Sequence, residues 1–191
     1  MALIDLAGRT IRGKIVYYGP GFGGKTTNLR SVYAGLPPGT GRALEEIATE
    51  DGRTLFCDVL SLDLGSVLGF RVHYDLYTVP GQVLYERTRT AVLNGADGVV
   101  FVADAQADRL PENRQSLEEL ARNVERQGKR AGAFPLVMQY NKMDLPGALP
   151  AAELDRSLNA IGAPRFEASA VTGRGVVETL REICKLVTRA L

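Results

Sequence analysis

The chain has 191 residues, with 23 basic and 22 acidic side chains and a formal net charge of +1. This length suits a single sizeable core, so we expect residues 1–191 to form one domain. The near-neutral balance, without a Lys/Arg cluster, argues against a nucleic-acid-binding protein. Cys57 and Cys184 lie far apart and the chain has one histidine, which argues against a zinc site.

The sequence shows no targeting signal. Its N-terminal residues lack the basic and long apolar regions of a signal peptide, and no run approaches the roughly 18 apolar residues that a membrane span needs. Residue 2 is Ala and the chain ends in TRAL, so neither myristoylation nor prenylation is encoded. We therefore expect a cytoplasmic protein with reduced cysteines and no direct membrane insertion.

Strand-like and helix-like segments alternate along the chain. Residues 98–103, for example, form a continuous apolar run between two aspartates, as expected of a central strand. Residues 40–52 are polar and we expect them to be irregular. This alternation predicts an α/β fold with a mostly parallel sheet of six to seven strands and helices on both faces. In chain order, the expected elements are a strand at 12–18, a helix at 26–33, strands at 53–61 and 70–78, a helix at 84–93, a strand at 98–103, a helix at 111–127, a strand at 136–140, a helix at 151–159, a strand at 164–168 and a helix at 176–191.

Residues 19–26 read GPGFGGKT, which fits the phosphate-binding pattern G-x-x-x-x-G-K-[ST] without a mismatch. We call this segment the phosphate loop. An expected strand precedes it and an expected helix follows it, which disfavours the alternative of a glycine-rich turn with a surface lysine. Glycines let backbone N–H groups converge on an anion, and the helix N-terminus adds positive potential. Lys25 is expected to reach the outer phosphates, and the Thr26 hydroxyl to coordinate Mg²⁺. The predicted phosphate-contacting residues are Gly19, Gly21, Phe22, Gly23, Gly24, Lys25, Thr26 and Thr27.

Residues 141–144 read NKMD and directly follow an expected buried strand; we call them the guanine loop. The Asp144 carboxylate can accept hydrogen bonds from N1–H and the 2-amino group of guanine, whereas adenine would leave buried polar groups unpaired. The Lys142 stem can lie over the base, while Asn141 can tie this loop to the phosphate loop. Ser169 and Ala170 follow the last strand, where a backbone N–H can meet guanine O6. These features predict binding of GTP and GDP.

Residues 78–82 read TVPGQ and end the expected strand 70–78. Gly81 can donate its backbone N–H to a γ-phosphate, because the missing Cβ permits close approach. Gln82 can orient the attacking water for hydrolysis. Taken alone, this run is equally compatible with a Pro-Gly turn that carries an exposed glutamine.

The three motifs, in this order, resemble those of a Ras-type small GTPase, and the likeness is greatest to the bacterial MglA group of gliding-motility and cell-polarity GTPases. It extends over essentially the whole chain. The resemblance implies a GTP-hydrolysing switch that uses Mg²⁺, with a roadblock-domain activating partner of the MglB type, often a homodimer. It also implies polarity or motility effectors and recruitment to a cell pole by partners. The runs that carry the likeness are YYGPG at 17–21, ATE at 48–50, RTLF at 53–56, LYTVPGQ at 76–82 and GVVFVAD at 98–104.

The resemblance also implies roles in the first switch segment, residues 40–54. Thr54 aligns with the family's threonine that senses Mg²⁺ and the γ-phosphate, with Thr40 and Thr49 as further candidates. Arg53 resembles the group's intrinsic arginine finger, whose guanidinium stabilises charge in the transition state. The alternative for Arg53 is a solvated side chain on a loop.

Thr78 stands where the wider Ras pattern has an aspartate that holds Mg²⁺ through a water molecule. The MglA group shares this threonine, but its lack of charge leaves open how Mg²⁺ is retained. Asp58 on the neighbouring strand is a candidate substitute, although a structural or solvent-facing role is the favoured interpretation.

Two other functions are compatible with these motifs. The first is a guanine-nucleotide-binding scaffold or polarity marker with negligible hydrolysis, which the uncertain Mg²⁺ shell favours. The second is a P-loop ATPase or nucleotide kinase, which Asp144 opposes.

Overall fold

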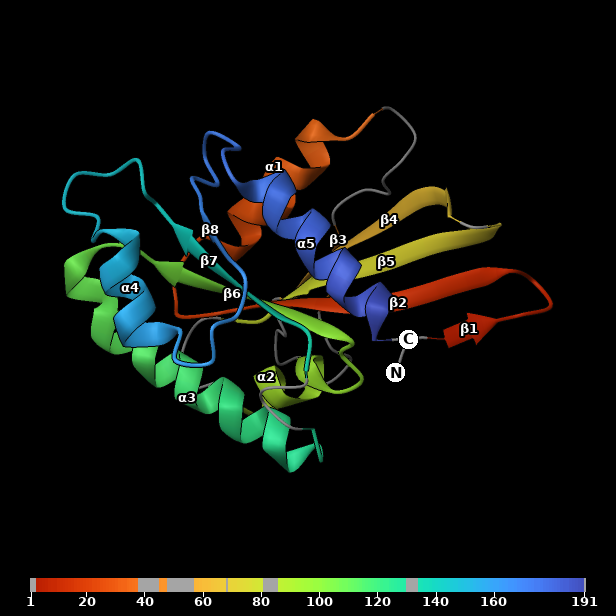
Figure 1. Cartoon of the computed structure of the whole chain (residues 1–191), viewed down its shortest axis with the longest axis horizontal. Coiled ribbons are helices and arrows are strands. Elements are labelled where there is room, and N and C mark those ends of the chain that lie inside the picture. Colours follow the sequence, from red (N-terminus) through yellow and green to blue (C-terminus); the bar gives the residue numbers. More distant parts are fainter. Residues whose placement is uncertain are drawn as a thin grey trace.

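A single sheet with helices on both faces organises the chain (Figure 1). The computed structural model describes residues 3–37, 45–47, 57–67, 69–80, 86–129 and 134–190. The strands are β1 (Leu3–Asp5), β2 (Thr10–Tyr18), β3 (Glu45–Ile47), β4 (Cys57–Val67), β5 (Phe70–Thr78), β6 (Gly98–Asp104), β7 (Leu136–Asn141) and β8 (Arg165–Glu167). The helices are α1 (Lys25–Gly35), α2 (Glu86–Leu93), the 3₁₀ helix η2 (Ala107–Arg109), α3 (Leu110–Arg126), α4 (Ala151–Leu158) and α5 (Val176–Arg189).

The strand order is β3-β4-β5-β2-β6-β7-β8, with β1 paired to the first half of β2. The five strands from β5 to β8 in this order run parallel, whereas β4 is antiparallel to β5 and the short β3 and β1 are antiparallel to their neighbours. The predicted mostly parallel α/β sheet is therefore confirmed. The sheet has eight strands when the three-residue strands β1 and β3 are included.

The alternation of side chains along β2 supplies both cores. Ile15 and Tyr17 point to the core under α1 and α5, while Val16 and Tyr18 point to the core under α2, α3 and α4. All seven residues of β6 are buried, as expected for a central strand covered on both faces. Within the described parts of the chain, no helix is both long and apolar enough to cross a bilayer.

Within the described residues, the predicted elements agree with the structure to within two residues at their ends, except around β3 and β4 and for strand β1, which was not predicted. The expectation of irregular backbone at 40–52 is wrong for β3, whose three residues are too few to show a periodic pattern. The strand predicted at 53–61 continues to Val67, because a shift of register between Asp63 and Ser66 accommodates Gly65 at a φ of +76°. β5 matches its prediction at both ends.

We expect Ile183→Ala to lower the free energy of unfolding by about 2–5 kcal/mol, because it leaves a cavity in a packed core. Ile183 lies on α5 with none of its surface exposed. Urea unfolding of the GDP-loaded protein measures the change. The control is Lys185→Ala, which loses only an exposed contact to Glu182 at 3.4 Å. A loss below about 1 kcal/mol in Ile183→Ala would contradict the packing described.

Candidate functional site

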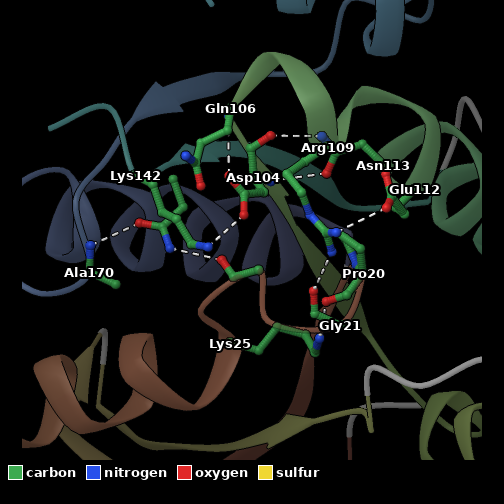
Figure 2. A network of polar contacts seen from close by, with 12 residues as sticks. Pro20, Gly21, Lys25, Asp104, Gln106, Arg109, Glu112, Asn113, Lys142 and Ala170 are labelled. Atoms are coloured by element: carbon green, nitrogen blue, oxygen red, sulfur yellow. Dashed lines mark hydrogen bonds and ion pairs between the residues drawn. The ribbon is translucent and has the colours of Figure 1, made fainter. Parts of the chain in front are cut away.

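The predicted loops meet at the edge of the sheet where the parallel strands end (Figure 2). The phosphate loop follows β2, and the guanine loop begins with the last residue of β7. Ser169 and Ala170 follow β8. Segments more than 100 residues apart in the sequence therefore form one site.

The phosphate loop packs against its neighbours too closely to accept side chains at two glycines. A Cβ added to Gly19, whose φ is +144°, would lie 2.2 Å from the Val102 carbonyl oxygen. A Cβ added to Gly24, whose φ is +95°, would lie 2.2 Å from Nδ2 of Asn141. α1 begins immediately afterwards, so its first N–H groups adjoin the loop. Phe22 has a φ of +61° and is 83% exposed. Its side chain therefore faces solvent, and its backbone is the part that lines the phosphate loop.

Lys25 is not a surface lysine, since only 6% of it is exposed. Its ammonium donates to two neutral acceptors, the carbonyl oxygens of Pro20 at 2.7 Å and Gly19 at 3.1 Å. Burial, with a smaller contribution from the nearby Arg89, lowers the pKa of Lys25 to about 7, and Asp58 opposes this. The side chain thus places a desolvated positive group inside the loop, where an anion would favour its charged form.

Asp58 is a buried acceptor beside Thr26, so its solvent-facing interpretation is wrong. The Thr26 hydroxyl donates to Asp58 Oδ2 at 2.5 Å, and the Thr78 hydroxyl donates to the same oxygen at 2.9 Å. The Asp58 backbone N–H in turn donates to the Thr78 hydroxyl at 3.0 Å. The antiparallel register of β4 and β5 places positions 58 and 78 opposite each other, and sequence reasoning missed this contact because no local pattern specifies the register.

Asn141 connects the two loops, as the sequence predicts. Its Nδ2 donates to the Gly23 carbonyl oxygen at 2.8 Å, and its Oδ1 accepts from the Ala170 N–H at 2.8 Å. The Ser169 N–H donates to the Arg174 carbonyl oxygen at 2.9 Å. In this structure the turn holds Asn141, and a contact of its N–H groups with guanine O6 stays a prediction. Asp144 is exposed at the edge of the guanine loop.

The connection between β6 and α3 contributes two contacts that sequence reasoning missed (Figure 2). Lys142 Nζ lies 2.5 Å from Asp104 Oδ2, and Arg109 Nη2 donates to the Gly21 carbonyl oxygen at 3.3 Å. Arg109 also pairs with Glu112 at 2.9 Å. The one local signal was a charged residue at the end of an apolar strand, which by itself does not identify a partner.

Several predicted residues lie outside the part of the chain that the structure describes. They include the proposed catalytic pair Arg53 and Gln82, together with Thr54 and Gly81. The alternative switch threonines, Thr40 and Thr49, also lie outside it. Their roles stay predictions.

Comparison with known proteins identifies the family. Residues 60–187 match the ADP-ribosylation factor family. The sequence is 47% identical over 191 residues to the Mutual gliding-motility protein MglA of Myxococcus xanthus, covering 100% of this chain and 98% of that protein. The chain belongs to the MglA type of Ras-like small GTPases. This GTPase binds guanine nucleotides and hydrolyses GTP, so the non-hydrolysing scaffold and the ATPase or kinase alternatives are not favoured.

Eukaryotic relatives are more distant from this MglA-type GTPase. It is 28% identical over 137 residues to human ADP-ribosylation factor-like protein 4C, covering 68% of each chain. It is also 28% identical over 123 residues to ADP-ribosylation factor-like protein 6 of Caenorhabditis elegans, covering 61% of this chain and 63% of that protein. The guanine-nucleotide fold is thus shared well beyond bacterial proteins.

We expect Asn141→Ala to accelerate GDP release roughly tenfold or more, because it removes the hydrogen bonds that join the guanine loop to the phosphate loop and to the turn after β8. Stopped-flow release of fluorescent GDP measures the rate. The matched control is Asn159→Ala, because the Asn159 amide makes the same pair of bonds to the backbone of Ala163, at 2.9 and 2.8 Å, beyond α4. Both variants should lose stability, but only Asn141→Ala should change the rate of GDP release. Equal GDP release rates in the two variants would refute the role of Asn141 in joining the loops.

Proposed function

We propose that this MglA-type GTPase controls bacterial cell polarity or gliding motility by cycling between GDP-bound and GTP-bound states. The Myxococcus xanthus relative, 47% identical over the full chain, is a gliding-motility protein. The observation that best supports nucleotide binding is the pair of hydrogen bonds made by the Asn141 side chain. They join the guanine loop to the phosphate loop and to the turn after β8, and one nucleotide would extend across both loops. Residues 40–54 and 78–88 would be ordered by GTP and released after hydrolysis.

In this proposal the nucleotide is recognised at both ends. The phosphate loop surrounds the phosphates with its N–H groups, and Lys25 supplies the positive charge. Asp144 selects guanine, and the Lys142 stem lies along the base. The turn at 169–170 supports this region by holding Asn141, as its hydrogen bonds indicate.

We assign Mg²⁺ binding to Thr26, with Asp58 supplying the carboxylate that position 78 lacks. The donor set fits the ion, because Mg²⁺ prefers oxygen ligands and often binds through one or two carboxylates together with substrate phosphates. Thr78 has a supporting task, because its two hydrogen bonds orient Asp58 toward Thr26. Thr54 of the first switch would complete the protein's contribution. When bound, Mg²⁺ neutralises charge that develops on the β- and γ-phosphates.

Hydrolysis is assigned to residues of the two switch segments. Gln82 would orient the attacking water, and the Gly81 N–H would contact the γ-phosphate. Arg53 would stabilise charge as the bond to the γ-phosphate breaks. A roadblock-domain dimer of the MglB type is the proposed activating partner, and polarity or motility effectors would read the GTP state. Recruitment of a cytoplasmic pool to a cell pole would depend on such partners.

We expect Arg53→Ala and Gln82→Ala each to retain GTP binding while reducing partner-stimulated hydrolysis by about 10³-fold or more, as for other arginine fingers and water-orienting glutamines. Single-turnover hydrolysis with and without a roadblock-domain partner measures this. Arg114→Ala is the control, since Arg114 is an exposed arginine on α3 near Ser157. An unchanged stimulated rate would remove the substituted residue from the mechanism. Absence of turnover in the wild-type protein under both conditions would instead support a scaffold.

We expect Asp58→Asn to raise the Mg²⁺ concentration needed for half-maximal GDP retention by about tenfold, because a charged acceptor contributes more than a neutral one. The variant keeps the shape of the side chain and removes its charge. Asp75→Asn is a matched control on the same hairpin, where Asp75 accepts from the Ser61 hydroxyl at 2.6 Å. The same Mg²⁺ dependence in both variants would rule out Asp58 as the substitute carboxylate.

A further inference from the structure

Asp104 and Lys142 form an ion pair at the entrance to the guanine loop. Asp104 is the last residue of β6, and Lys142 directly follows β7. These strands are parallel neighbours, and their register sets Asp104 beside Asn141. Lys142 Nζ therefore reaches Asp104 Oδ2 at 2.5 Å, as Figure 2 shows. Since Asp104 is 1% exposed and the Lys142 side chain 26% exposed, the carboxylate is the fixed partner and the lysine the accessible one.

The orientation of Asp104 is set by its own neighbours. Its Oδ1 accepts from the Gln106 N–H at 3.1 Å, which leaves Oδ2 for Lys142. Its backbone N–H donates to Asn113 Oδ1 at 2.9 Å, and its carbonyl oxygen accepts from Asn113 Nδ2 at 2.7 Å. Asn113 is fully buried on α3. These hydrogen bonds fix the orientation of the carboxylate, so that Oδ2 faces the guanine loop.

Lys142 needs such a restraint more than an ordinary lysine does. Its φ is +67°, a left-handed conformation that non-glycine residues seldom adopt. Its backbone is constrained by the adjacent residues, because Asn141 is clamped and the Met143 N–H donates to the Ala168 carbonyl oxygen at 3.1 Å. Among the residues that the structure describes, the polar contact that restrains the side chain is the ion pair with Asp104, and a free lysine side chain would have many rotamers.

We propose that Asp104 is a positioning residue for nucleotide binding, which acts by holding Lys142 so that its aliphatic stem is already arranged along the guanine base. Preorganisation of this kind lowers the conformational entropy lost on binding and lengthens the lifetime of the complex. The proposal rests on the assignment of base recognition to the guanine loop. It separates two tasks: Asp144 selects the base, and the Asp104–Lys142 pair keeps the selected base bound.

The test uses two conservative variants of the ion pair. Asp104→Asn keeps an oxygen for the Gln106 N–H but presents an amide to Lys142, and Lys142→Met keeps the stem but loses the ammonium. We expect each to accelerate GDP release by about tenfold, as loss of a charge-assisted contact should. The double variant should release GDP no faster than Lys142→Met alone, because Asp104 acts through Lys142. The ratio of GDP to IDP release rates should stay at its wild-type value.

Asp155→Asn is the matched control. Asp155 Oδ1 accepts from the Tyr140 hydroxyl at 2.7 Å, and Oδ2 accepts from Arg165 Nε at 2.8 Å, so neither partner belongs to the phosphate loop or the guanine loop. This control should lose stability in thermal unfolding without changing GDP release. If the two aspartate variants differ only in stability, Asp104 is a structural residue and the proposal is overturned. Additive effects in the double variant would overturn it as well.

Two further measurements keep failures distinguishable. Lys142→Met changes a partly exposed side chain, so it decides the question even if Asp104→Asn folds poorly; wild-type release in Lys142→Met overturns the proposal. Asp144→Asn should exchange preference for GDP for preference for XDP. If Asp144→Asn changes its preference in this way and Asp104→Asn releases GDP at the wild-type rate, only the positioning role fails. If Asp144→Asn keeps its preference for GDP, the assignment of base recognition to the guanine loop and the positioning role fail together.

Discussion

The amide of Asn141 is the interaction on which the site depends. A single planar side chain donates to the phosphate loop and accepts from the turn after β8, at 2.8 Å in each direction. The close approach of Gly24, where a Cβ would lie 2.2 Å from the Asn141 amide nitrogen, shows that the phosphate loop is shaped around this contact. Three strand ends are thereby fixed relative to one another before any side chain contacts a ligand.

The sequence predicted those parts of the site that are encoded locally. The phosphate loop and the guanine loop are short contiguous runs, and the chemistry of each depends on residues within a few positions. Strand β5 was predicted at both ends because it lies between clear turns. The contacts of Asp58 and Asp104 were not predicted, because their partners lie on or beside neighbouring elements that are distant in the sequence. Their contacts follow from the register of β4 with β5 and of β6 with β7, which no local pattern specifies.

A second group of buried charges connects the phosphate-loop side of the sheet to α2. Arg89 on α2 lies 2.5 Å from Glu119 on α3, with both side chains buried. The Tyr18 hydroxyl donates to the other oxygen of Glu119 at 3.1 Å, and burial together with this carboxylate raises the pKa of Tyr18. An ion pair this deep needs both partners, since an unpaired buried charge costs about 3–5 kcal/mol. The position of α2 is therefore linked to β2, the strand that leads into the phosphate loop.

The same arginine also acts on Lys25, because its charge adds to the effect of burial in lowering the lysine pKa. Arg89 and Lys25 thus both lie near the phosphate loop, and their charges are compensated differently. Arg89 is neutralised by Glu119, whereas the Lys25 ammonium meets carbonyl oxygens and the more distant Asp58. An anionic phosphate is attracted to the lysine, which lacks a close carboxylate, and not to the arginine that already has one. The pairing of Arg89 with Glu119 therefore leaves Lys25 as the less compensated cation of the two, and separation of this pair would alter the electrostatic potential at the phosphate loop.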